Sequence, residues 1–238
     1  MIIEGAFLKI PEILLNYDNK DDLYEANIVS LLTNAIILEL NARNIDNPLM
    51  KLQLEKRYNS EKNIRCDLYT YFDFIKDNKL NEYGYFNENW IEVKYFGDLD
   101  RAKGNQTKTE NAANIMYDLY RLAKNSDANI SKGLYSLNIF GHNISKYLAF
   151  NRKDKSERIW LRTLLKSGVN KFSFNLDEEP PTQQNVFGGV NKVEFSGKIR
   201  TLLFEPLCTE NNQFSGYLIQ ILSFHLADEH EIREWSIS

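Results

Sequence analysis

A glutamate and a lysine separated by one residue, Glu92 and Lys94, lie within the hydrophobic stretch 90–96. This stretch is rich in β-branched and aromatic residues and has no Gly or Pro, which predicts a β-strand. Because strand side chains alternate, Glu92 and Lys94 are expected on one face, roughly 7 Å apart. A carboxylate and an ammonium are costly to bury unless they are paired or bind an ion. Two other acid-x-Lys triplets, at 18–20 and 77–79, lie in polar, turn-like sequence, so only the Glu92 triplet has this context.

A second acidic strand is predicted just before this one. Residues 64–72 alternate in polarity and carry Asp67 on the face opposite to Cys66. The simplest arrangement of the two strands is an antiparallel pair, which would bring Asp67 close to Glu92. The structural alternatives are that Asp67 pairs with a nearby base, Arg65 or Lys94, and that the Glu92 triplet is an ion pair on a solvent-facing surface.

Two carboxylates on adjacent strands can hold Mg²⁺ while leaving positions for water. The ion polarises a phosphodiester and helps to generate hydroxide. Lys94 would orient or deprotonate the attacking water, or stabilise the pentavalent phosphate. A third acid, Glu39, falls on the buried stripe of a helix predicted over 23–43 and would join the site through water or bind a second metal ion. The alternative for Glu39 is an ion pair with Arg43, four residues further on.

These residues resemble the PD-(D/E)xK nuclease superfamily, in particular the type II restriction endonucleases. The matching order is a helix with Glu39, a strand with Asp67, a strand with Glu92-Val93-Lys94 and a helix over 108–124. The resemblance covers residues 21–124. It implies a mixed sheet flanked by helices, Mg²⁺-dependent phosphodiester cleavage, and Asp67, Glu92, Lys94 and Glu39 as the site.

The resemblance departs from the family pattern at one position. Cys66 precedes Asp67 where the family name has a Pro. Asp73 lies six residues after Asp67 on the same nominal face and is its rival for the aspartate role.

A local basic segment stands out from an acidic chain, which has a net charge of −4 and a pI of about 5.5. The overall charge argues against a generally basic nucleic-acid coat protein, but the segment 146–171 has eight basic and only two acidic residues. A basic patch of this kind is a candidate for contacts with DNA phosphates, the alternative being a solvated face. A helix over 156–167 would align three of its members at four-residue spacing. The expected phosphate contacts are Lys153, Lys155, Arg158, Arg162 and Lys166.

The remainder of the chain is predicted to be rich in β-structure, with strands at 171–175, 192–195, 199–204 and 217–224. A polar loop over 180–191 lies between the first two strands. Its amide side chains suit base edges, and we expect sequence readout from Gln183, Gln184 and Asn185.

The fold class expected from these elements is α/β (α+β), with a restriction-endonuclease-like mixed central sheet flanked by helices and a β-rich C-terminal part. Residues 1–141 would form the catalytic core, and residues 142–238 the basic segment and the recognition part. One continuous domain is the alternative. Residues 1–20 are expected to be irregular apart from a short helix at 11–16.

Other features limit the class of protein. Two cysteines are too few for a cysteine zinc site and fit reduced thiols. There is no apolar run of 18 or more residues and no signal-peptide pattern. Abundant Asn, Lys and Ile fit an AT-rich bacterial genome. We therefore expect a cytoplasmic bacterial protein without a membrane partner.

The function expected from the sequence is Mg²⁺-dependent cleavage of double-stranded DNA by a type II restriction endonuclease. A homodimer is expected because two symmetric sites cut both strands of a palindrome. The alternatives are a repair or mobile-element nuclease of the same superfamily and a non-catalytic DNA-binding protein on the same scaffold.

Overall fold

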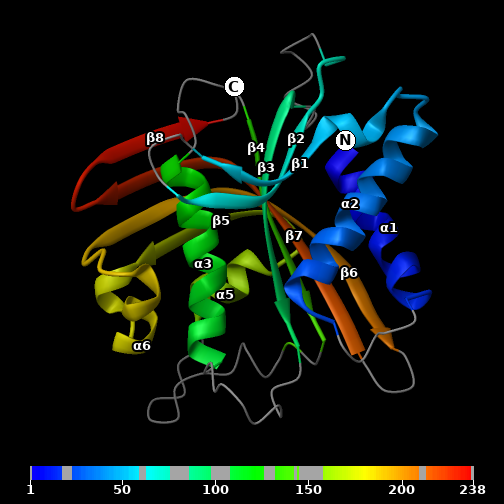
Figure 1. The fold of residues 1–238 in the computed structure, drawn as a ribbon. Coiled ribbons are helices and arrows are strands. Elements are labelled where there is room, and N and C mark those ends of the chain that lie inside the picture. Colours follow the sequence, from blue (N-terminus) through cyan, green and yellow to red (C-terminus); the bar gives the residue numbers. More distant parts are fainter. Residues whose placement is uncertain are drawn as a thin grey trace.

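A mixed sheet of eight strands runs through the computed structural model, which describes residues 2–17, 23–58, 63–75, 86–97, 108–125, 132–141, 144, 158–208 and 213–236 (Figure 1). The strand order is β1-β2-β3-β4-β7-β6-β5, and β8 pairs with β7. The pair β3–β4 is parallel and the other pairs are antiparallel. The strands are β1 Leu52–Arg57, β2 Arg65–Tyr71, β3 Glu88–Phe96, β4 Gly133–Phe140, β5 Gly168–Asn175, β6 Val193–Cys208, β7 Gln213–Asp228 and β8 Ile232–Ser236.

Helices cover both faces of the sheet, so the expected mixed α/β fold is confirmed. Figure 1 shows α1 and α2 on one side and α3 and α5 on the other, and each group packs on its own hydrophobic core. The helices are α1 Ile2–Leu15, α2 Glu25–Ala42, α3 Lys108–Asn125, α5 Ile159–Leu164 and α6 Pro181–Gln184, with 3₁₀ turns at Pro48–Lys51, Leu176–Glu178 and Asn185–Phe187. Among the helices described, none is long and apolar enough to cross a membrane.

The helix α3 connects the two parallel strands at the centre of the sheet. Parallel neighbours need such a crossover, because a tight turn cannot join their ends. The strand β3 is buried on both faces, with Ile91 and Val93 toward α2 and Trp90 toward α3. This placement puts the Glu92 triplet between two layers of helix.

The N-terminal segment was expected to be irregular apart from a short helix at 11–16. It forms the long helix α1 instead. Gly5 and Pro11 discourage a helix there, yet apolar residues at three- and four-residue spacing bury one side of it against α2. Gly5 also allows close approach of the two helices, because a Cβ at this position would lie 2.7 Å from the Glu39 carboxylate. Tertiary packing therefore overrides local propensity.

The two strands expected at 192–195 and 199–204 form one long strand, β6. The ladder between β6 and β7 continues through Gly197, with a register shift between Lys198 and Ile199. A Cβ on Gly197 would lie 2.0 Å from the Ser223 carbonyl oxygen, so the glycine permits the close contact between backbones.

The sheet also crosses the expected division between residues 141 and 142. The strand β4, before the division, pairs with β7, after it, from Tyr135↔Gln220 to Phe140↔Ser215. The sheet is therefore built from strands on both sides of this division.

Candidate active site

The strands β2 and β3 part at the two acidic residues of interest. Their antiparallel ladder runs from Tyr71↔Glu88 to Leu68↔Ile91. Beyond Leu68, the side chain of Asp67 continues the connection, with Oδ2 accepting a hydrogen bond of 2.6 Å from the backbone N–H of Val93. Asp67 and Glu92 each lie one residue beyond the last backbone pair, so the structure places them side by side at the fork.

Glu92 is fully buried at this fork. Its Oε1 accepts a hydrogen bond of 2.5 Å from the Tyr58 hydroxyl and lies 3.1 Å from Nη2 of Arg121. Its Oε2 is buried and has no hydrogen-bond partner among the described residues. Burial raises the pKa of Glu92 well above its usual value, and the nearby Asp118 adds to this, whereas Arg121 opposes it. The ionised form of Glu92 is therefore disfavoured in this environment, and a nearby cation would stabilise it.

Lys94 is held by carboxylates from two helices. Its Nζ donates to both carboxylate oxygens of Glu25 at 3.2 Å and lies 3.6 Å from Oδ2 of Asp118. Burial alone would lower the pKa of Lys94, but Asp118 and Glu25 raise it above its ordinary value. Lys94 is therefore an ammonium that can orient water or stabilise a phosphate, and it is not suited to deprotonate water.

Sequence reasoning missed three charged residues at this site, Glu25, Asp118 and Arg121. Asp118 is buried, with Oδ1 3.6 Å from Nη1 of Arg121. Burial raises the pKa of Asp118 to about 7, against the lowering effect of Lys94 and Arg121. The sequence could have indicated Asp118, because this residue lies beside the apolar stripe of α3, where burial of an unpaired carboxylate is unfavourable. Glu25 gave no such signal, because an acid in the first turn of a helix is ordinary.

The site has more acidic than basic groups. Among the described residues, four acids (Glu25, Asp67, Glu92 and Asp118) lie with two basic side chains, Lys94 and Arg121. These six side chains form one connected set of contacts and charge interactions. Carboxylate oxygens are the donors that Mg²⁺ prefers, and it usually takes one or two of them together with water.

The fit to a metal ion can be tested on the donor set itself. Among the described residues, no three His, Cys, Asp or Glu side chains are grouped closely enough to hold a metal together. A pair of carboxylates at the fork, including the unpartnered Oε2 of Glu92, nevertheless suits Mg²⁺ with water as the remaining ligands. The residues therefore fit a two-carboxylate site.

The structure corrects the expectation for Glu39. Its carboxylate is ion-paired with Arg43 at 2.6 Å and with Lys9 at 3.3 Å. Glu25 lies fourteen residues earlier on the same helix, which is roughly 20 Å along the axis. Glu39 is thus on the buried stripe of α2, as predicted, but stabilises the contact with α1 and is not brought to Glu92.

The rival aspartate, Asp73, is not brought to the fork. Its exposed side chain pairs with Lys51 at 2.7 Å, near the opposite end of β2. Asp67 is therefore the aspartate that the structure places beside Glu92.

The expected DNA contacts are only partly accessible. Lys153 and Lys155 lie outside the described residues. Arg158 and Gln183 are buried, so we remove both from the candidate contacts. Burial lowers the pKa of Arg158 to about 10, although Glu179 opposes this.

Of the remaining residues, Gln184 donates to the carbonyls of Leu176 and Glu179, while Arg162, Lys166 and Asn185 are exposed.

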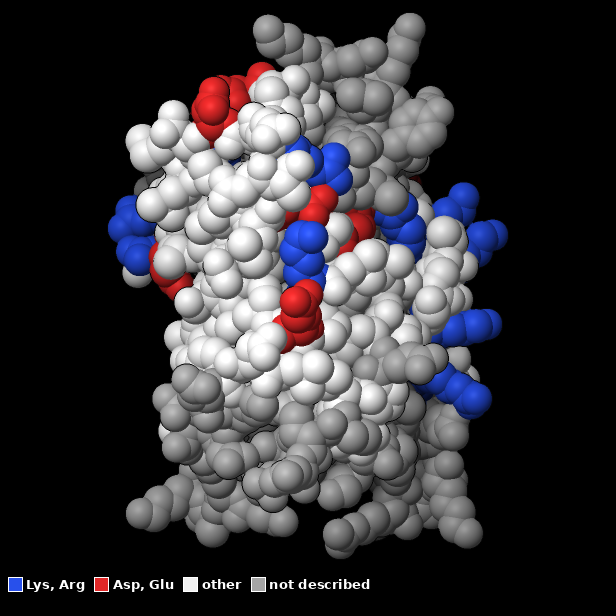
Figure 2. Space-filling model, turned by 90° about the vertical axis from the view of Figure 1, so that its right-hand side faces the viewer, with Lys and Arg blue, Asp and Glu red and all other residues white. Residues whose placement is uncertain are grey.

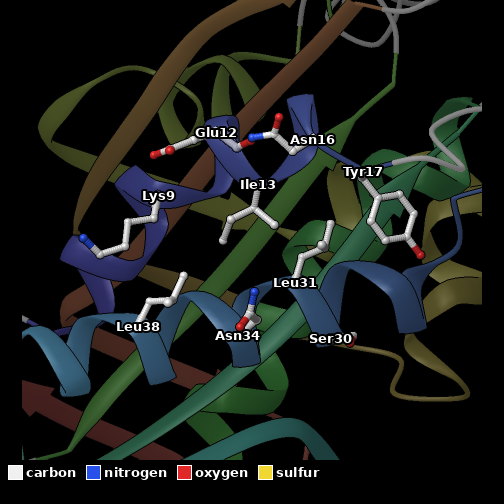
Figure 3. Close-up of a pocket in the computed structure, with 9 residues that line it drawn as sticks. All are labelled: Lys9, Glu12, Ile13, Asn16, Tyr17, Ser30, Leu31, Asn34 and Leu38. Atoms are coloured by element: carbon white, nitrogen blue, oxygen red, sulfur yellow. The ribbon is translucent and has the colours of Figure 1, made fainter.

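A separate hollow of about 700 Å³ lies between α1 and α2 (Figure 3). Its only charged lining residues are Lys9 and Glu12, whose charges cancel. Figure 2 shows acidic and basic groups alternating near the centre of this side of the molecule, with further Lys and Arg groups along its right-hand edge. The described lining of this hollow therefore lacks the excess of positive charge that phosphate binding favours.

Comparisons with protein-family models, with curated proteins and with solved structures found no match.

Proposed function

We propose that this chain is a Mg²⁺-dependent endonuclease of the PD-(D/E)xK type that cleaves double-stranded DNA, and specifically a type II restriction endonuclease. The observation that carries the proposal is the fork between β2 and β3. It holds Asp67 beside a buried Glu92, whose Oε2 has no hydrogen-bond partner in the described part of the chain, with Lys94 on the same strand.

The roles of the chain's own residues follow from their contacts. Asp67 and Glu92 would hold the ion, which when bound supplies charge for the scissile phosphate and lowers the pKa of a bound water. Lys94 stabilises negative charge on the phosphate, because Glu25 and Asp118 keep it protonated and fixed in place. In the reaction, the water oxygen would bond to phosphorus as the bond to the leaving nucleotide oxygen breaks; the proton that the attacking water loses passes to solvent, and the leaving oxygen takes up a proton from solvent.

Binding and assembly form the second part of the proposal. Arg162, Lys166 and Asn185 are the remaining exposed candidates for DNA contacts. A homodimer would place two such sites on the two strands of a palindromic sequence. As a restriction enzyme, the protein would act in the bacterial cytoplasm, where its DNA substrate lies.

The direct test is incubation of the purified protein with long duplex DNA, with Mg²⁺ or with EDTA, followed by gel electrophoresis. Discrete fragments formed only with Mg²⁺ are the expected result. A smear of fragments would contradict a restriction enzyme and indicate a repair-type or nonspecific nuclease. DNA that is bound but left intact would contradict catalysis and favour a DNA-binding scaffold.

A further inference from the structure

A polar hollow of about 550 Å³ opens beside the carboxylate site, between the edge formed by β1 and β2 and the helix α3. Two guanidinium groups and one carboxylate give this lining a net positive charge. The residues around it are Glu55, Asn63, Ile64, Arg65, Tyr117 and Arg121.

Arg121 belongs both to this hollow and to the carboxylate site. Its Nη2 is 3.1 Å from Glu92 and its Nη1 is 3.6 Å from Asp118, while Nη2 also donates to the backbone carbonyl of Arg65. Its Nε is buried and has no hydrogen-bond partner among the described residues. The guanidinium of Arg121 therefore lies between Glu92 and the hollow, and its Nε–H donates no hydrogen bond within the described part of the chain.

Arg65 presents the second guanidinium of the hollow. Its side chain is exposed at the start of β2, two residues before Asp67, and within the part of the chain that the structure describes its Nη2 has one long contact, 3.5 Å from Oδ1 of Asn63. A guanidinium matches two phosphate oxygens with parallel N–H donors, which makes arginine well suited to bind phosphate.

We propose that this hollow binds a phosphate of the DNA backbone adjacent to the scissile phosphate, with Arg65 and Arg121 as the donors. The inference rests on the proposed function, because it assumes a DNA strand that passes the fork. A divalent cation on Glu92 would take over the neutralisation that Arg121 provides and would repel its guanidinium. Arg121 is then free to turn toward the phosphate, so ion binding and DNA binding support each other.

Glu55 provides a second test, because removing its negative charge should change DNA affinity in the opposite direction from removing the positive charge of Arg65. It is exposed, lines the same hollow and has a φ of 52°, a left-handed conformation that is uncommon for a residue other than glycine. Its carboxylate would repel a bound phosphate. Glu55→Gln should therefore strengthen DNA binding, while Arg65→Gln should weaken it.

The experiment measures the Kd of a short labelled duplex by fluorescence anisotropy at several NaCl concentrations, with Ca²⁺ in place of Mg²⁺ to suppress cleavage. For Arg65→Gln we expect Kd to rise about 5- to 10-fold and the slope of log Kd against log[NaCl] to fall by about 1. Arg121→Gln should give a similar loss, and Glu55→Gln should lower Kd. Lys198→Gln, which removes an exposed charge from β6, is the matched control and should bind like the wild type.

The outcomes separate this inference from the proposed function. Wild-type cleavage with Mg²⁺, together with unchanged Kd and salt slope for Arg65→Gln, would overturn the phosphate site while the nuclease stands. A wild type that neither binds nor cleaves DNA would overturn both. Arg65→Gln removes no buried contact, so it keeps the test valid if Arg121→Gln fails to fold, which circular dichroism would show.

Discussion

Asp118 is the residue whose charge depends most directly on its surroundings. Burial brings its pKa to about 7, compared with about 3.9 for an exposed aspartate. The folded protein thus holds this proton more tightly than the unfolded chain does. Asp118 therefore stabilises the fold below about pH 4, and this contribution is lost as the pH rises to about 7.

A pH dependence of metal stabilisation follows at the same site. Glu92 must ionise to bind the ion beside Asp67, and the pKa of Glu92 is raised by burial and by the nearby Asp118, so the rise in Tm caused by Mg²⁺ should be larger at pH 8 than at pH 5.5. Differential scanning fluorimetry with and without Mg²⁺ measures this. Asp118→Asn should flatten the metal-free dependence of Tm between pH 5 and 8. An equal Mg²⁺ effect at both pH values would contradict the account.

At the scale of elements, the helix α2 carries two partly or fully buried acids with different roles. Glu25 in its first turn holds Lys94, whereas Glu39 near its end binds Lys9 and Arg43. Glu25→Gln should slow DNA cleavage about 10- to 100-fold, because residues that orient an active group typically have effects of this size.

Glu39→Gln is the matched comparison on the same helix. It should leave the cleavage rate within about 3-fold of the wild type, with a loss of stability as its main effect, since it removes a structural ion pair. Initial cleavage rates, together with duplex affinity in Ca²⁺, check both variants. A larger rate loss for Glu39→Gln than for Glu25→Gln would restore Glu39 to the site.

The same two residues show what sequence patterns can and cannot predict. Periodicity places Glu39 on the buried stripe of α2 correctly, and alternation places Asp67 and Glu92 on facing positions of adjacent strands. Periodicity does not say which partner a buried acid meets, because that depends on how helices pack. Glu25 reaches Lys94 because α2 packs against β3, and this packing is not encoded in local spacing.

In the molecule as a whole, the sheet extends well beyond residues 21–124. The pairing β4–β7 joins the N-terminal and C-terminal halves, and it could not be foreseen because it links residues about eighty positions apart. The strand β8 was also missed, since its exposed, charged sequence has a weak strand pattern. The mixed α/β class was predictable because long apolar elements set it.

Asp228 ties the C-terminal strands to α3. It accepts hydrogen bonds from Lys124 at 2.5 Å and from the Tyr120 hydroxyl at 2.9 Å, and its side chain is fully buried. Burial alone would raise the pKa of Asp228, but these hydrogen bonds lower it to about 2. Its contribution to stability is therefore present above about pH 4 and is lost as the pH falls toward 2.

Asp228→Ala should lower the free energy of unfolding at pH 7 by about 2–3 kcal/mol, because it removes charged hydrogen bonds at a buried position. Urea denaturation measures the change. Glu234→Ala removes an exposed acid from β8 and should change stability by less than about 0.5 kcal/mol. Equal effects of the two substitutions would show that the tie to α3 contributes nothing.

The rate of Mg²⁺-dependent cleavage of plasmid DNA by Asp67→Asn and Glu92→Gln tests whether the fork between β2 and β3 is the active site. Both variants should fold, bind duplex DNA and cleave at least about 100-fold more slowly than the wild type, because each removes charge where the ion and the phosphate meet. Glu234→Gln, on the exposed strand β8, should cleave at the wild-type rate. Wild-type cleavage by Glu92→Gln would contradict the assignment of the fork as the active site.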